Sequence, residues 1–163
     1  MLPLDDFKKL IEISSLFAFD FIVKDEDGRV LLGLRCNSPA EGYWFVPGGR
    51  TYKNETLTEA LSRISKAELG FEVTKDIINP IGLFEHVYKD SFFPEVNFGT
   101  HYIVLAIEVK IPVEKNSLPS FQHSSYKFLN VHDLLNDISV HPFTKSYFID
   151  TPSNLFLKLN KTV

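Results

Sequence analysis

The sequence predicts an α/β domain in which a mixed β-sheet is sandwiched between helices. Two observations support this class. Strand-sized apolar segments recur along the chain, among them Leu16–Val23 and His101–Val109, and one long segment, Asn54–Leu69, has apolar residues near a period of 3.6. A chain of 163 residues, 44% of them hydrophobic, is long enough for one core but not for two large ones. We therefore predict a single domain over residues 1–163.

The first segments predict a short helix followed by a β-hairpin. Asp5–Ser14 has apolar residues at helical spacing and acidic residues in the position to cap the first turn. Leu16–Val23 and Arg29–Leu34 are both strand-like, and Asp25–Gly28 between them has the composition of a tight turn. We expect these two strands to pair across that turn.

The main amphipathic helix follows a glycine pair. Cys36–Gly42 is typical of a loop, and Gly48-Gly49 interrupts the apolar run that comes after it. The segment Asn54–Leu69 then has a continuous apolar face, and Gly70 is the residue type favoured just beyond a helix end. This helix also carries a group of polar residues that bear on function.

The second half predicts two further strands around a long loop. Ile81–Val87 and His101–Val109 are the strands, and Tyr88–Gly99 is long enough to contact a substrate. The remaining expected elements are a loop over Leu118–His123, a strand over Tyr126–Leu129, a helix starting in Val131–Leu135 and a final helix within Phe143–Leu159.

Composition excludes several classes of protein. The formal net charge of −4 supplies no overall basic field for a nucleic-acid polymer. The longest apolar runs are strand-sized, far below the roughly 20 residues of a membrane span. The single cysteine, Cys36, cannot form an internal disulfide, and no secretory signal pattern is evident. We expect a cytoplasmic protein that binds neither a membrane nor a nucleic-acid polymer.

The residues after the glycine pair have a diagnostic spacing. Gly49 is followed after five residues by Glu55 and after seven more by Arg63, and Glu68-Leu69-Gly70-Phe71 begins five positions further on. A glycine turn between a strand and a helix allows close approach of a phosphate or metal. This pattern resembles the box of the Nudix hydrolase family. The resemblance implies a Nudix fold, an α/β/α sandwich.

Two departures from that box narrow the resemblance. Ile64 and Ala67 stand where the family has glutamates, whereas Glu68 is retained. A box altered in this way, together with the segment Gly42–Arg50, is similar to the Nudix branch of GDP-mannose mannosyl hydrolases. The resemblance implies a homodimeric, Mg²⁺-dependent enzyme that hydrolyses GDP-mannose, with GDP-glucose as a second candidate. Water would attack the anomeric carbon, and GDP and mannose would leave with inverted configuration.

The resemblance also implies a role for individual residues. The Mg²⁺ ligands would be the Gly48 carbonyl, Glu68 and Gln122. The catalytic residues would be His123 as general base, with Arg50, Arg63 and Tyr102 acting on the leaving GDP. The substrate-binding residues would be Leu2, Phe7, Asp20, Arg35 and His86.

Other interpretations of the same residues stay open. Arg63 is placed to pair with Glu59 one helical turn away, and Glu55 is placed to hold the glycine turn or to pair with Arg63. Phe7 and Tyr102 are also compatible with ordinary core packing. Two alternative functions are a Nudix pyrophosphatase that cleaves a P–O bond and a catalytically weak sensor of nucleotide sugars.

Overall fold

The computed structural model describes residues 3–109, 118–119, 123–149 and 155–158. Leu2 and Gln122, two of the predicted site residues, lie outside the described residues. The helices and strands are, in chain order, α1 (Leu4–Ile13), β1 (Leu16–Val23), β2 (Val30–Arg35), β3 (Trp44–Phe45), β4 (Gly48–Arg50), α2 (Leu57–Leu69), the 3₁₀ turn η1 (Lys75–Ile77), β5 (Ile78–Val87), β6 (His101–Val109), β7 (His123–Leu129), α3 (Val131–Asn136), α4 (Pro142–Ser146) and β8 (Leu155–Lys158).

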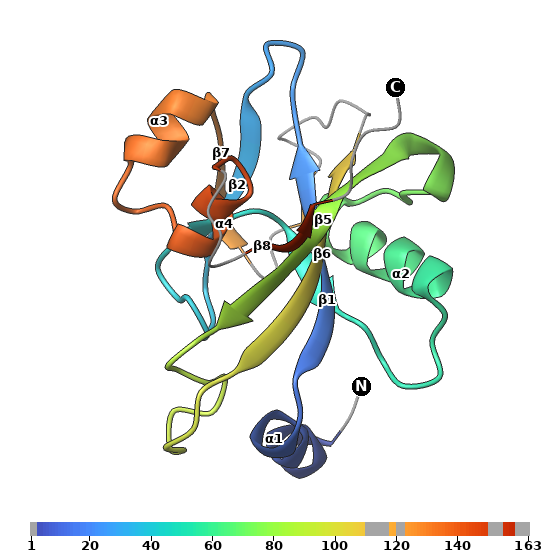
Figure 1. Ribbon diagram of the computed structural model, residues 1–163, viewed down its shortest axis with the longest axis vertical. Helices are drawn as coiled ribbons and strands as arrows, with labels where there is room; N and C mark the ends of the chain where they lie inside the picture. The colour runs from blue at the N-terminus through green and yellow to red at the C-terminus, as the bar shows by residue number, and fades with distance from the viewer. Residues whose placement is uncertain (1–2, 110–117, 120–122, 150–154, 159–163) are drawn as a thin grey trace.

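The strands form two sheets between helices (Figure 1). The larger sheet has the order β4-β1-β6-β5-β8, and the smaller one has the order β3-β2-β7. Strands β1 and β6 are parallel while β1 and β4 are antiparallel, so the larger sheet is mixed. Helix α2 lies on one side of the strands and α3 and α4 lie on the other. The predicted α/β class, with mixed sheet and flanking helices, is confirmed.

The predicted hairpin is wrong, although its turn is correct. Asp25–Gly28 does form a tight turn, with Gly28 at a φ of 76° and a single bridge between Lys24 and Val30. Beyond that bridge the two strands enter different sheets. The reason is that both edges of β1 are already paired, one with β4 and the other with β6. Strand β2 pairs with β3 and β7 instead.

Strand β1 separates two hydrophobic clusters. Phe19 and Phe21 belong to the cluster formed with α2, whereas Ala18 and Ile22 belong to the cluster that includes residues of α3 and α4. This division follows from the alternation of side chains along a strand. Asp20 lies between Ala18 and Ile22 in that alternation and is only 7% exposed. A carboxylate is therefore buried on the side away from α2.

Helix α2 begins three residues later than predicted, at Leu57 instead of Asn54. Thr56 is the N-cap, and its side chain and that of Glu59 form a capping box. Asn54 has a φ of 66° and so cannot continue the helix. At the other end Gly70 has a φ of 78°, which confirms the predicted helix end.

The last third of the chain contains two corrections. Strand β7 begins at His123 instead of Tyr126, because its first residue still pairs with Arg35 of β2 across a bulge. The predicted final helix is only the short α4, Pro142–Ser146. Leu155–Lys158 forms strand β8, because the outer edge of β5 accepts it as an antiparallel partner.

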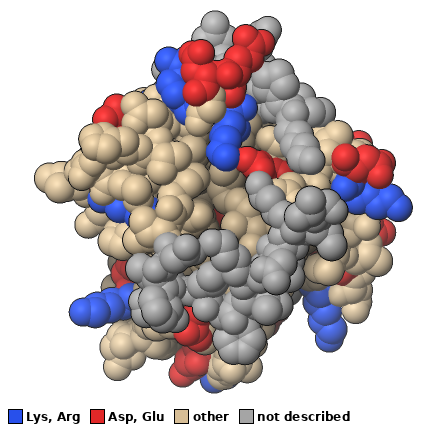
Figure 2. All heavy atoms as spheres, turned by 45° about the horizontal axis from the view of Figure 1, so that its top comes forward, with Lys and Arg blue, Asp and Glu red and all other residues tan. Residues whose placement is uncertain are grey.

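Charged residues are mixed on the face drawn in Figure 2, where acidic and basic side chains lie in small groups among neutral ones. Ion pairs of this kind include Arg29 with Asp25 at 2.8 Å and Lys24 with Glu108 at 2.6 Å. Among the residues coloured there, no continuous basic surface of the kind that holds a phosphate backbone is present. No helix in the described part of the chain is long and apolar enough to cross a bilayer.

Candidate active site

The antiparallel pairing of β1 and β4 brings Asp20 against Gly48. A Cβ at Gly48 would lie 2.5 Å from the carbonyl oxygen of Phe19 and would overlap Oδ1 of Asp20, so only glycine fits there. Phe21 N–H donates to the Pro47 carbonyl and Thr51 N–H to that of Phe17. In an antiparallel ladder, residue pairs joined by hydrogen bonds alternate with pairs that are not. The Asp20–Gly48 pair is one of those without hydrogen bonds, so the Gly48 carbonyl points away from β1.

Glu68 supplies a second buried carboxylate from the last turn of α2. It is 3% exposed, and burial raises its pKa to about 7, with the charge of Asp20 acting in the same direction. Burial likewise raises the pKa of Asp20 to about 7, against the opposing effects of a hydrogen bond from Tyr147 and the charge of Arg35. Two carboxyl groups whose pKa values are both raised to about 7, and of which one affects the ionisation of the other, indicate a functional site.

Arg35, at the end of β2, is the cation shared by these groups. Its Nε donates to the Pro39 carbonyl at 2.9 Å, which fixes the guanidinium within the loop after β2. Its positive charge opposes the effect of burial on Asp20 and Glu68. The groups whose pKa responds to this charge are Asp20, Glu68, Tyr88, Tyr102, His123 and His141. Six titratable side chains from different elements are therefore within electrostatic range of one arginine.

His123 opens β7 with its imidazole buried beside Glu68. Its Nδ1 lies 3.7 Å from Glu68 and 3.3 Å from Oη of Tyr126. The Tyr126 hydroxyl donates to the Pro119 carbonyl at 2.6 Å, so its oxygen is left to accept a hydrogen bond from Nδ1–H. In this tautomer Nε2 carries the lone pair, and Nε2 is buried with no hydrogen-bond partner among the described residues.

The protonation state of His123 suits a proton acceptor. Burial, and secondly the charge of Arg35, lower its pKa to about 4. The ring is thus neutral near pH 7. Gly33 of β2 makes room for it, because a Cβ at Gly33 would lie 2.5 Å from Cγ of the imidazole. The structure therefore presents a neutral, closely confined imidazole with an unused lone pair.

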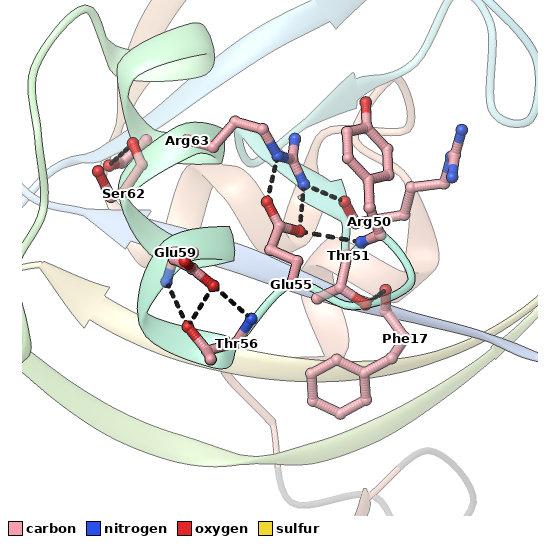
Figure 3. Close-up of polar contacts among 10 residues, drawn as sticks. Phe17, Arg50, Thr51, Glu55, Thr56, Glu59, Ser62 and Arg63 are labelled. Atoms are coloured by element: carbon pink, nitrogen blue, oxygen red, sulfur yellow. Dashed lines mark hydrogen bonds and ion pairs between the residues drawn. The ribbon is translucent and has the colours of Figure 1, made fainter. Parts of the chain in front are cut away.

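Glu55 and Arg63 hold the turn that carries the glycine pair (Figure 3). Nε and Nη2 of Arg63 donate to the two carboxylate oxygens of Glu55 at 2.6 and 2.9 Å. Nη2 also donates to the Arg50 carbonyl, and Glu55 accepts from the backbone N–H of Tyr52. The expected interaction of Glu55 with Arg63 is confirmed. The alternative pair with Glu59 is wrong, since Glu59 caps α2 at Thr56.

We expect Glu55→Gln to lower the free energy of unfolding by about 1–2 kcal/mol, because the forked ion pair is part-buried and charge-assisted. Urea unfolding monitored by circular dichroism measures this change. Glu72→Gln is the matched control, since Glu72 contacts Lys66 and Ser62 at the exposed surface and its replacement should cost less stability. Equal losses in the two variants would contradict a structural role for the Glu55–Arg63 pair.

Arg50 connects this turn to the N-terminal helix. Its guanidinium lies 4.2 Å from the ring centre of Phe7 and 4.8 Å from that of Tyr52. Phe7 also packs against Phe92 and Phe93 in the loop between β5 and β6. Arg50 lies near Tyr102 as well, because its charge contributes to the pKa of that hydroxyl. The structure thus brings Phe7 against Arg50 and places Arg35 and Arg50 within electrostatic range of Tyr102.

His86 and Tyr102 lie directly opposite each other on β5 and β6. His86 is 1% exposed, and burial lowers its pKa to about 3, so the ring is neutral. The Tyr147 hydroxyl lies between His86 and Asp20: it donates to Asp20 Oδ2 and lies 3.2 Å from His86 Nε2. Asp20, His86 and Tyr147 therefore form a connected polar group inside an otherwise apolar core.

The donor set suits Mg²⁺. The described residues contain no group of three His, Cys, Asp or Glu side chains that could hold a metal. Mg²⁺, however, is commonly bound by one or two carboxylates, with phosphate oxygens and water in the remaining positions. The outward-pointing Gly48 carbonyl and the Glu68 carboxylate are oxygen donors of this type. Asp20 pairs with Gly48 and is close enough to Glu68 for its charge to raise the pKa of Glu68. Gln122, the third predicted ligand, lies outside the described residues.

Tyr147, Tyr126 and Gly33 were not among the predicted site residues. Tyr147 stands four positions after Phe143, a spacing that places two aromatic rings on one face of a helix. That spacing was available in the sequence. Gly33, by contrast, has no local pattern, because its contact with His123 comes from the pairing of β2 with β7. Tyr126 lies only three residues from His123 in β7, a spacing that the prediction did not use.

Comparison with known proteins gives consistent results. A model of the NUDIX domain matches residues 15–150. The low-salt glycan biosynthesis protein Agl8 of Haloferax volcanii is 37% identical over 147 residues, which cover 90% of this chain and 88% of that protein.

Solved structures show the same fold at lower identity. The MutT protein from Methanosarcina mazei Go1 has a TM-score of 0.62 and 19% identity, covering 82% of this chain and 90% of that one. The NUDIX domain of Shewanella oneidensis NrtR, solved with ADP ribose, has a TM-score of 0.57 and 17% identity, covering 86% of this chain and 90% of that one. These likenesses show the fold alone.

Proposed function

The chain belongs to the Nudix hydrolase family, and from this premise we propose that it hydrolyses GDP-mannose with Mg²⁺. Water attacks the anomeric carbon, the C–O bond to the diphosphate breaks, and GDP and mannose of inverted configuration leave. The relative Agl8 is named for glycan biosynthesis, which supports a sugar-containing substrate. GDP-glucose is a second candidate substrate.

The observation that carries this proposal is the juxtaposition of one box carboxylate with a neutral, buried histidine. Glu68 and His123 lie 3.7 Å apart. Ile64, at a position where the Nudix box has a glutamate, is 2% exposed and packs in the apolar cluster under α2. Ala67, at another such position, offers no oxygen ligand. The site thus has a proton acceptor but few metal-binding carboxylates, which favours attack at carbon over attack at phosphorus.

Each residue has a role that fits its surroundings. The His123 Nε2 lone pair takes a proton from water, while Tyr126 holds the other ring nitrogen. Arg50 and Tyr102 stabilise charge on the departing GDP, and such contacts act most strongly in the transition state. Arg63 acts as a positioning residue, because its guanidinium is committed to Glu55 and the Arg50 carbonyl.

The remaining predicted residues bind or hold the substrate. Arg35 contributes positive charge for the diphosphate, and Asp20 with His86 binds the sugar. Phe7, stacked on Arg50, contributes to the guanine end together with Leu2. Glu68, the Gly48 carbonyl and Gln122 would hold Mg²⁺. When bound, the ion neutralises negative charge on the diphosphate leaving group.

Reaction in ¹⁸O-labelled water with GDP-mannose and Mg²⁺ tests the bond that breaks. Mass spectrometry is expected to find the label in free mannose and none in GDP. Label in GMP or mannose 1-phosphate would overturn the proposal in favour of the pyrophosphatase, which cleaves a P–O bond. Absence of turnover would favour another nucleotide sugar or a sensor role.

Mg²⁺ affinity is expected to rise with pH between 6 and 8. The pKa of Glu68 is about 7 in the metal-free protein, and the metal binds only the ionised carboxylate. About one tenth of Glu68 is ionised at pH 6 and about nine tenths at pH 8, so affinity should increase about tenfold. Isothermal titration calorimetry with MgCl₂ at the two pH values measures this.

Glu68→Gln is the control for that titration. The variant keeps the size of the side chain but has no titrating carboxylate at this position, so its residual Mg²⁺ binding should be weak and should change less with pH than that of the wild type. Asp20, whose pKa is also about 7, accounts for any pH dependence that remains. If the wild-type protein bound Mg²⁺ equally well at pH 6 and pH 8, Glu68 would not be a ligand.

A further inference from the structure

Tyr147 makes two buried polar contacts that no role described so far uses. Its hydroxyl donates to Oδ2 of Asp20 and lies 3.2 Å from Nε2 of His86, and the residue is 8% exposed. A hydroxyl has only one proton. Since that proton goes to the carboxylate, the tyrosine oxygen accepts from His86, whose Nε2 must then be protonated.

The short helix α4 also packs against His86, through the side chain of Phe143. Phe143 in α4 stacks on His86 with ring centres 4.4 Å apart and an angle of 2° between the planes. Tyr147 follows it by four residues, so both rings project from one face. The Tyr147 ring is itself held edge-on against Phe84 at 4.7 Å. The hydroxyl therefore has little freedom to leave Asp20 and His86.

We propose that Tyr147 is a positioning residue that orients Asp20 and His86 as a pair of hydrogen-bond acceptors for sugar hydroxyls. With its Nε2 proton engaged by Tyr147, His86 has its lone pair on Nδ1, and the Asp20 carboxylate is anchored through Oδ2 so that Oδ1 keeps its free lone pairs. Two acceptors favour a ligand end that donates hydrogen bonds, which a polyol does and a phosphate does not. This inference rests on the proposed function, since it assigns the sugar end of that site.

Tyr147→Phe removes the hydroxyl and keeps the packed ring. We expect kcat/KM for GDP-mannose to fall about tenfold, which corresponds to one charge-assisted hydrogen bond. Inhibition by GDP should be unchanged, because GDP lacks the sugar. A merely structural role would instead weaken substrate and GDP binding together.

Thr144→Val is the matched control. Thr144 lies in the same helix and is fully buried, and its hydroxyl has no hydrogen-bond partner among the described residues. Removing it should leave both kcat/KM and GDP inhibition as in the wild type. If Tyr147→Phe kept the wild-type kcat/KM, or if Thr144→Val lost as much activity, the inference would be overturned.

Nitrogen-15 NMR of the wild-type imidazoles tests the inference without any variant or turnover. The expected result is a neutral His86 with its proton on Nε2, whereas a proton on Nδ1 would overturn the inference. Failure of the proposed function looks different: the wild-type protein would then leave GDP-mannose intact while the His86 tautomer was still Nε2–H.

Discussion

Replacing His123 by alanine is expected to lower kcat for GDP-mannose by about two to four orders of magnitude, the usual contribution of a general base. The physical reason is the unused lone pair on the buried Nε2 of a neutral ring. GDP affinity should change little, because the loss concerns proton transfer to the base and not the nucleotide. Steady-state kinetics together with GDP titration measure the two effects separately.

His132→Ala is the control for this experiment. His132 is 86% exposed in its side chain and pairs only locally, with Asp133 and Asn136 among the described residues. Its replacement should leave kcat unchanged. Wild-type turnover by His123→Ala would show that another group accepts the proton.

Gly33→Ala is expected to lower kcat about a hundredfold, although Gly33 touches no substrate. The added methyl would lie 2.5 Å from Cγ of His123 and would force the imidazole to move. A displacement of about 1 Å at a catalytic group can cost a factor of about 10² in rate. Kinetics of the variant and its thermal unfolding, measured in parallel, separate displacement of the base from loss of fold.

The double variant Gly33→Ala/His123→Ala completes this test. If Gly33 acts only through the histidine, the double variant should be no slower than His123→Ala alone, because interacting sites are not additive. Removal of the ring also relieves the clash, so the double variant should be at least as stable as Gly33→Ala. Additive losses in kcat would mean that Gly33 affects the site by another route.

Much of the secondary structure was predictable because its causes are local. The glycine at the end of α2 and the apolar run of β1 depend on residues a few positions apart. The capping box of Thr56 and Glu59 is equally local, but the prediction missed it and started the helix at Asn54. The spacing from Gly49 to Glu68 likewise carried the resemblance to the family, because that spacing is a property of one continuous segment. Glu55 was expected either to hold the glycine turn or to interact with Arg63, and its contacts with Tyr52 N–H and with Arg63 do both.

The failures of prediction concern contacts between distant segments. No local pattern shows that β4 and β6 occupy both edges of β1 and exclude β2 from its sheet. The same applies to Leu155–Lys158, which forms a strand because it pairs with the outer edge of β5. A strand can pair with several possible partners, and the free energy of each pairing depends on the whole sheet.

In the candidate site, too, some properties follow from the sequence and others only from contacts between distant segments. The sequence by itself determined which chemical groups are present, the family spacing and the loss of two box carboxylates. Only the tertiary structure decided their states: burial raises the pKa of Asp20 and Glu68 to about 7, and Tyr126 directs the His123 lone pair to Nε2. Ionisation depends on burial, which is supplied by elements far apart in the chain. The tautomer of His123 depends on Tyr126, which is close in sequence but reaches Nδ1 only in the folded geometry of β7.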